Sequence, residues 1–92
     1  MQSDKLINIG KIIGVFGIKG ELKIYSESDF IDYRFRIGAH IYLKSKKIAK
    51  EAVVTSMRIH KKTILIQIDN LNDINLVSHY IGCDIYAKYE DF

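Results

Sequence analysis

The 92-residue sequence contains one cysteine, no proline and no tryptophan. A single cysteine, Cys83, excludes an intrachain disulfide and leaves a cysteine-based zinc site without a second thiolate. We therefore expect Cys83 to be a buried structural thiol. Charged residues or glycines interrupt every apolar run, so no segment approaches the roughly 20 apolar residues that a membrane-spanning helix needs. We expect a soluble chain with no membrane partner.

Targeting and catalytic signatures are also missing. The first residues are polar and lead into a strand-like segment without the apolar region of a secretory signal, so the expected compartment is the cytoplasm. The three histidines lie far apart, and no serine or cysteine stands in a motif of nucleophilic catalysis. We expect no enzyme activity, no catalytic residue, no cofactor and no metal site.

Acidic residues are scarce relative to basic ones in the first two thirds of the chain. Residues 1–62 hold thirteen Lys and Arg against six Asp and Glu, whereas residues 63–92 hold one Lys against five acids. A basic region favours a polyanion such as RNA, because each neutralised phosphate releases condensed counterions. A solvated, lysine-rich surface is the alternative, and charge alone leaves both interpretations open.

What the sequence has in quantity is period-two alternation of apolar and polar residues, which predicts an all-β domain. Its seventeen isoleucines and six tyrosines suit a pleated, half-buried surface. Six short antiparallel strands in a closed barrel fit this pattern, because closure leaves no exposed edge. We expect the strands at about Lys5 to Ile13, Glu21 to Tyr25, His40 to Lys44, Glu51 to His60, Thr63 to Asp69 and Cys83 to Lys88.

The periodicity changes once, within residues 72–82. Apolar residues recur there at helical spacing, and either Asn72 or Asp73 can provide the N-cap. Gly82 follows the last of them and can end the helix. The sequence therefore predicts one short helix between the fifth and sixth strands, and a tight hairpin turn at Lys61 and Lys62 between the fourth and fifth.

Four glycines, Gly10, Gly14, Gly17 and Gly20, stand close together after the first strand pattern begins. At such a density the backbone takes positive φ or lets another group approach closely. We expect a turn from Gly14 to Gly20. A phosphate-binding loop is the alternative, but the spacing fits neither G-x-G-x-x-G nor G-x-x-x-x-G-K-[ST], and a strand follows where a helix should begin.

The segment from Gly10 to Ile24, GKIIGVFGIKGELKI, resembles the opening signature of the RimM family of ribosome maturation factors. The resemblance covers about Leu6 to Tyr86 and departs from the usual family pattern at Tyr33, where Asp is common, and at Phe16, where His is common. It continues in three further motifs, namely YRF at 33–35 followed by Gly38 and IYL at 41–43, VVTSMRIH at 53–60, and DINLVSHYIG at 73–82.

This resemblance implies a β-barrel similar to barrel domains of translation factors and a binding activity without catalysis. The implied partner is the immature small (30S) ribosomal subunit, contacted through the head protein uS19 and nearby 16S rRNA to assist head maturation and rRNA processing. We expect a monomer in which residues 1–88 form the N-terminal domain, with residues 89–92 starting a linker to an absent C-terminal PRC-type barrel. A protein-interaction barrel inside an unrelated larger protein is the alternative.

The candidate partner-binding residues come from the glycine segment and the fourth hairpin. For any single lysine a solvated charge is the simpler interpretation, and Gly17 and Gly20 are expected to shape the turn. Arg34 is expected to fasten its loop through backbone carbonyls. The partner-binding candidates are Phe16, Gly17, Ile18, Lys19, Gly20, Arg58, His60, Lys61 and Lys62. The residues expected to be structural are Gly10, Gly14, Arg34, Phe35, Gly38 and Gly82.

Overall fold

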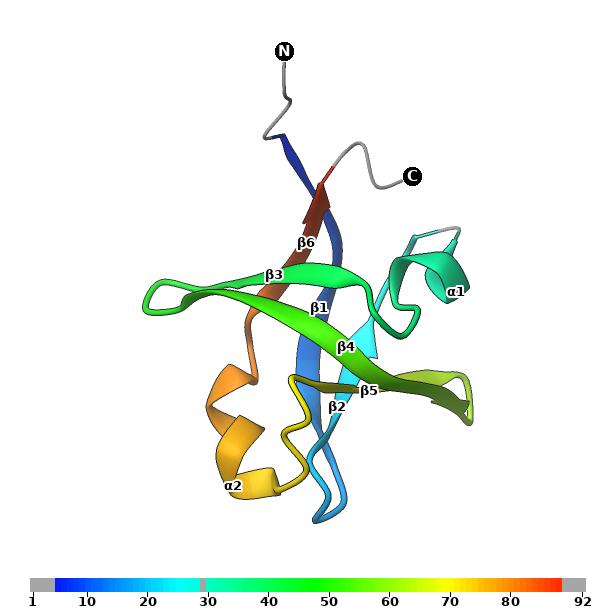
Figure 1. Ribbon diagram of the computed structural model, residues 1–92, viewed down its shortest axis with the longest axis vertical. Coiled ribbons are helices and arrows are strands. Elements are labelled where there is room, and N and C mark those ends of the chain that lie inside the picture. Colours follow the sequence, from blue (N-terminus) through cyan, green and yellow to red (C-terminus); the bar gives the residue numbers. More distant parts are fainter. Residues whose placement is uncertain (1–4, 29, 89–92) are drawn as a thin grey trace.

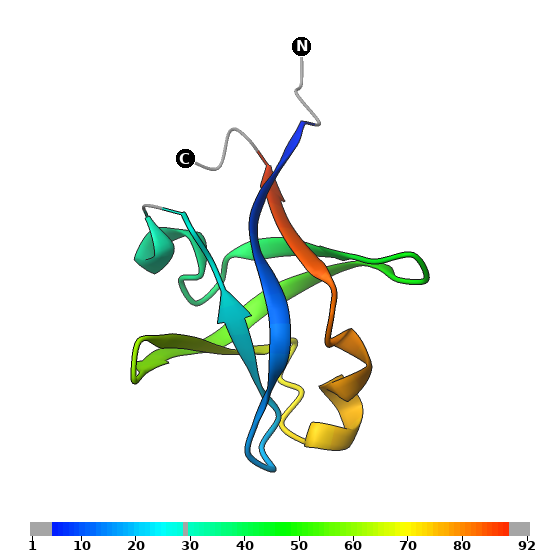
Figure 2. The same cartoon turned by 180° about the vertical axis from the view of Figure 1, so that it is seen from behind.

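The computed structural model describes residues 5–28 and 30–88, in which six antiparallel strands close into a barrel in the order β1-β2-β5-β4-β3-β6 (Figures 1 and 2). This confirms the all-β antiparallel barrel that the sequence predicts. Residues 89–92, where we expect a linker to start, lie outside the described part. The strands are β1 (Leu6–Phe16), β2 (Glu21–Tyr25), β3 (His40–Lys44), β4 (Ala49–His60), β5 (Thr63–Ile68) and β6 (Asp84–Lys88).

Alternating side chains of the strands build a single apolar core inside the ring. Leu22 and Ile24 of β2 point inward, as do Ile41 and Leu43 of β3, and all four are buried. Burying one such side chain contributes about 1.5–3 kcal/mol relative to leaving it exposed. Cys83 is also buried, as expected, and burial raises the pKa of its thiol.

Two long strands bend around the barrel at β-bulges. The register of β1 against β2 shifts between Ile12 and Gly14, and the register of β4 against β5 shifts between Val54 and Ser56. A bulge adds one residue to a strand and increases its twist without ending the pairing. Consequently β1 continues to Phe16, and our prediction that the strand ends near Ile13 is wrong.

The helix expected near residues 72–82 is confirmed. It consists of α2 (Ile74–Val77) followed by the 3-10 helix η1 (Ser78–Tyr80). Of the two N-caps that the sequence left open, Asp73 is the one used, because its carboxylate accepts a hydrogen bond from the backbone N–H of Asn75 at 2.8 Å. Gly82 follows with φ of 96°, a left-handed conformation that suits the end of a helix.

A second single-turn helix, α1 (Ile31–Arg34), follows β2 where the sequence predicts only a turn. Phe35 directly after it is fully buried and anchors this turn to the core. Gly38 lies between α1 and β3, and its N–H donates to the carbonyl of Val54 at 2.7 Å. No helix in residues 5–28 or 30–88 is long and apolar enough to cross a membrane.

Two hairpins project from the barrel on opposite sides (Figures 1 and 2). One joins β3 to β4 and the other joins β4 to β5, so the twelve-residue strand β4 carries a turn at each of its ends. At the top of Figure 1, Leu6 of β1 pairs with Lys88 of β6. The first and last described strands therefore lie side by side.

Candidate interaction surface

The outer face of the barrel carries one leucine that is fully buried. Ile64 and Ile66 of β5 point into the core, so Leu65 between them points outward, yet its exposed fraction is 0%. Its partners on the neighbouring strands are Lys23 of β2 and Arg58 of β4. An apolar side chain on the outside of a barrel is shielded from water only if other side chains cover it.

The ring of Phe16 at the end of β1 belongs to that cover. Its centroid lies 5.0 Å from the ring centroid of His60, at an interplanar angle of 50°. The ammonium of Lys23 lies 5.9 Å from the Phe16 ring centroid, and the guanidinium of Arg58 lies 5.5 Å from it. Cations at these distances are attracted by the ring's quadrupole, by about 0.5–1 kcal/mol at exposed sites. We call the following residues the outer cluster: Phe16, Glu21, Lys23, Arg58, His60 and Leu65.

Arg58 is held in place by a carboxylate from another strand. Its Nε and Nη2 each donate to one oxygen of Glu21 in β2, both at 2.8 Å. This two-point contact fixes the plane of the guanidinium. The hydrogen bond from Arg58 holds the pKa of Glu21 below its usual value, and the nearby side chains of Lys19 and His60 act in the same direction.

The hairpin turn beside the outer cluster has a strained backbone. Lys61 and Lys62 have φ of 49° and 68°, the left-handed values that a two-residue type I′ hairpin turn requires at both positions. Asparagine and glycine are the usual residues there, because left-handed backbone costs other residues about 1–2 kcal/mol each. Lys61 lines a hollow of about 240 Å³ together with residues of the outer cluster.

The turn between β1 and β2 is fixed against the start of α2. The carbonyl of Ile18 accepts a hydrogen bond from the N–H of Ile74 at 3.0 Å. Gly20 has φ of 74°, and a Cβ at this position would lie 2.9 Å from the carbonyl oxygen of Asp73. The turn therefore has little freedom, while the side chains of Ile18 and Lys19 remain exposed.

The structure groups some of the candidate partner-binding residues and separates others. Arg58 and His60 both lie against the ring of Phe16, and Lys61 lines the hollow beside Phe16 and His60. Lys62 is next to Lys61 in the turn. Gly17, Ile18, Lys19 and Gly20 form a different turn, which joins Phe16 to Glu21, and the charge of Lys19 acts on Glu21.

The expected turn from Gly14 to Gly20 includes Phe16, and for this residue the expectation is wrong. Phe16 lies in β1 and is half-buried, because the bulge near Gly14 extends the strand and directs the ring over the outer face. Sequence reasoning also missed Glu21, Lys23 and Leu65. A signal for Leu65 was present, because a strand that is apolar at consecutive positions has a covered outer face.

The remaining structural candidates differ in how strictly their positions need glycine. A Cβ at Gly10 would lie 2.8 Å from the carbonyl oxygen of Tyr25, so a larger residue does not fit there. A Cβ at Gly14 would meet only the aliphatic chain of Lys23, at an ordinary 3.6 Å. Gly14 lies within β1, not in the turn where the sequence places it, and has a negative φ.

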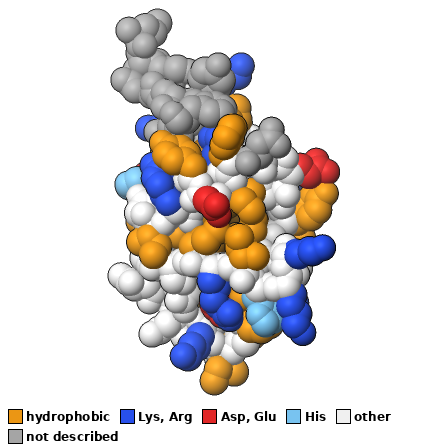
Figure 3. Space-filling model, turned by 90° about the vertical axis from the view of Figure 1, so that its right-hand side faces the viewer, with side chains coloured by type: hydrophobic (Ala, Val, Ile, Leu, Met, Phe, Trp, Pro, Cys, Tyr) orange, Lys and Arg blue, Asp and Glu red, His pale blue; other side chains and the backbone are white. Residues whose placement is uncertain are grey.

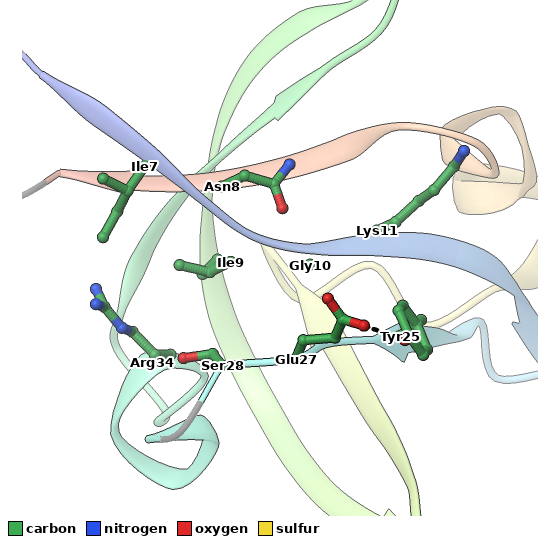
Figure 4. Close-up of a pocket in the computed structure, with 9 residues that line it drawn as sticks. All are labelled: Ile7, Asn8, Ile9, Gly10, Lys11, Tyr25, Glu27, Ser28 and Arg34. Carbon is green, nitrogen blue, oxygen red and sulfur yellow. Dashed lines mark hydrogen bonds between the residues drawn. The ribbon is translucent and has the colours of Figure 1, made fainter.

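Arg34 is almost completely buried, with an exposed fraction of 6%. It lines a second hollow, of about 420 Å³, between β1 and the segment after β2 (Figure 4). In this view Tyr25 and Glu27 lie on the same side of β1 as Arg34, and Tyr25 donates a hydrogen bond to Glu27 at 2.8 Å. The backbone carbonyl of Tyr33 in this turn accepts from Arg36, at 2.7 Å. The loop-fastening role expected of Arg34 stays a prediction.

The side of the molecule that carries the tip of the β4-β5 hairpin is shown in Figure 3. Hydrophobic side chains cross its middle, and Lys, Arg and His side chains surround the lower part. Within the described residues, no group of three or more His, Cys, Asp or Glu side chains could hold a metal ion. The outer cluster presents cations and an aromatic ring, which suit the binding of a partner molecule.

Comparison with known proteins supports the family resemblance. Residues 7–92 match the model of the RimM N-terminal domain. A ribosome maturation factor RimM from Limosilactobacillus fermentum is 36% identical over 88 residues, which are 95% of this chain and 52% of that protein. The factor of the same name from Staphylococcus aureus is 36% identical over 82 residues, covering 89% of this chain and 49% of that protein.

Two solved structures share the fold. The crystal structure of a 16S ribosomal RNA processing protein RimM from Pseudomonas aeruginosa has a TM-score of 0.83 at 27% identity, over 96% of this chain and 53% of that one. The solution structure of the N-terminal domain of RimM from Thermus thermophilus has a TM-score of 0.76 at 16% identity, over 96% of this chain and 94% of that one. This chain spans about half the length of the curated relatives. It belongs to the RimM family, and its barrel is the family's N-terminal domain.

Proposed function

We propose that this chain is the barrel domain of a ribosome maturation factor that binds the immature small subunit in the cytoplasm and assists 16S rRNA processing without catalysis. We further propose that it acts as a monomer and that its partners are the head protein uS19 and the 16S rRNA beside it. The family membership supports the general role. The proposed binding to uS19 and 16S rRNA rests on the outer cluster and on the lysines beside it, Lys19, Lys61 and Lys62.

The outer cluster suits a surface that is rigid before it meets a partner. The pair of Glu21 and Arg58 fixes one cation, and Phe16 provides an aromatic surface on which a base or a side chain can stack. Lys61 and Lys62 at the adjacent tip form no ion pair with any residue in the described ranges. They can therefore neutralise phosphates without first breaking a contact within the domain.

The test is association of the domain with purified small-subunit precursors across a salt titration. Reversing Lys19, Lys61 and Lys62 to Glu removes the flanking cations without touching the core. Each lost phosphate contact lowers the magnitude of the slope of log K against log salt by about 0.7–0.9. We therefore expect a slope smaller by about 2 and binding that is lost at physiological salt.

Ile18→Ser is the matched control for a contact made by protein alone. Ile18 is 82% exposed in the same turn as Lys19, so its removal leaves the core intact. If Ile18→Ser abolishes association while the triple reversal changes neither affinity nor salt slope, the RNA part of the proposal is wrong. Recovery of the domain with an unrelated complex instead of small-subunit precursors would refute the whole proposal.

A further inference from the structure

The β3-β4 hairpin is a second lysine-rich tip, at the other end of β4. Residues 44–50 contain four lysines and no acidic residue. Figures 1 and 2 show this hairpin on the opposite side of the barrel from the Lys61-Lys62 turn. At a rise of about 3.3 Å per residue, a strand as long as β4 separates its two turns by at most roughly 35 Å, because β4 bends at its bulge.

The backbone of this second tip is ordered by one serine. The N–H of Ser45 donates to the carbonyl of Ile48 at 2.8 Å, closing the turn. Its hydroxyl oxygen accepts from the backbone N–H groups of Lys47 at 3.3 Å and Ile48 at 3.1 Å. Serine commonly stabilises turns in this way. The lysines are thus presented from a fixed backbone, which lowers the entropy lost when a ligand binds.

The charges of this tip are largely uncompensated. Lys46 and Lys47 are exposed and form no ion pair with any residue within 5–28 or 30–88. Lys50, by contrast, pairs with Asp69 at 3.2 Å, so it stabilises the base of the hairpin. Lys44 faces Asp84 in the register of β3 and β6 but forms no ion pair with any described residue, so three cations remain available to an anion.

Aromatic side chains next to these cations favour RNA over an acidic protein. The ammonium of Lys44 lies 5.7 Å from the ring centroid of Tyr86. Tyr86 in β6 is paired directly with Tyr42 in β3, and both tyrosines are half-buried on the outer face. Cations beside aromatic rings suit single-stranded RNA, because phosphates meet the lysines while bases stack on the rings.

We propose that the β3-β4 hairpin is a second RNA-binding site, at which Lys44, Lys46 and Lys47 neutralise phosphates of a 16S rRNA segment different from the segment at the Lys61-Lys62 turn. The two tips point away from each other, so one short segment does not reach both. The barrel then bridges two parts of the immature RNA. This inference rests on the proposed binding to small-subunit precursors and adds a second site to it.

The first test measures binding of the domain to 16S rRNA transcribed in vitro. Lys46→Glu with Lys47→Glu should reduce the magnitude of the salt slope by about 1.5 and weaken binding about tenfold at 0.15 M salt, because two phosphate contacts are lost. Lys5→Glu with Lys11→Glu carries the same change in net charge outside both hairpins. We expect that control pair to have a clearly smaller effect, and equal effects would overturn the proposal.

The second test places a cleavage reagent on each tip. Lys47→Cys and Lys62→Cys variants carry an iron chelate for hydroxyl-radical cleavage of RNA in the precursor complex, and Cys83, with an exposed fraction of 1%, does not react. The proposal expects two separate sets of cleavages. Cleavage from position 62 without cleavage from position 47 would overturn the second site and leave the proposed function intact.

The outcomes of the two tests separate the two proposals. If the unmodified domain fails to bind either the precursor or 16S rRNA, the proposed function fails, and the second site fails with it. If it binds and the Lys46→Glu with Lys47→Glu pair weakens binding no more than the control pair does, the second site alone is refuted. A denaturation curve for each variant confirms that it is folded.

Discussion

Two lysines at the left-handed positions of the Lys61-Lys62 turn lower the stability of the domain. This can be tested by replacing them with Asn-Gly, the residues that a type I′ turn favours. Lys61→Asn with Lys62→Gly keeps the φ values of 49° and 68° but replaces both residues with ones that adopt them readily. Relief of left-handed strain gains about 1–2 kcal/mol per residue. Glycine reduces this gain in stability by about 0.4–1 kcal/mol, because it increases the conformational entropy of the unfolded chain. For the two residues together, the net stabilisation should be about 1–3 kcal/mol.

The assay is thermal and urea denaturation of the domain, with binding to small-subunit precursors measured on the same samples. For a domain of this size, 1 kcal/mol raises Tm by roughly 4–8 °C. We expect a higher Tm together with weaker, less salt-dependent binding. Lys46→Asn with Lys47→Gly is the matched control, because these residues have negative φ and the same charges. It should lose charge without gaining stability.

Two results would refute this reasoning. If the Asn-Gly turn leaves Tm unchanged or lowers it, the backbone of the turn is not strained as the φ values indicate. If both variants raise Tm equally, relief of repulsion between adjacent lysines explains the gain without any backbone strain. If Tm rises but binding to the precursors is unchanged, the two lysines of this turn do not contribute to binding.

Three further predictions concern stability and reactivity. Gly20→Ala should lower the urea midpoint more than Gly17→Ala, because both have φ of 74° but only Gly20 has a backbone oxygen within 2.9 Å of the new Cβ; equal losses would contradict the steric reasoning. Because Arg58 lowers the folded-state pKa of Glu21, the stability that this pair contributes is present above about pH 4.5 and is lost as the pH falls below it. Glu21→Gln should therefore be less stable than the wild type at neutral pH and equal to it in strong acid, and a constant difference would exclude the ionic contribution. Cys83 should react with a thiol reagent far more slowly in the folded domain than in urea, because it is buried and its thiol pKa is raised; rapid labelling of folded protein would contradict this.

Local patterns were sufficient to predict most of the barrel. In β2, alternation around Leu22 and Ile24 gives both the strand and its inward face, because each side chain is set by period two. The α2 helix could be predicted for a similar reason, because an N-cap residue and a terminating glycine are local signals. The end of β1 could not be predicted from local patterns, because the bulge near Gly14 depends on pairing with β2.

The outer cluster depends on contacts between distant parts of the sequence. Arg58 and Glu21 are 37 residues apart, and only the strand order brings them to neighbouring positions around β5. Basic residues could be selected from the sequence, but their partners could not. It was equally impossible to tell from local patterns that Lys61 lines the hollow beside the cluster, whereas Lys19 lies in the turn between Phe16 and Glu21.

The pairing of β6 with both β1 and β3 has a consequence for how the domain forms during translation. Until residues 84–88 leave the ribosomal exit tunnel, β1 and β3 remain two open edges with unpaired backbone groups. Such edges readily pair with other chains. The ring closes only when the last described strand inserts between them, through contacts that are distant in sequence and therefore slow to form. A chain cut short before Asp84 should consequently aggregate instead of folding.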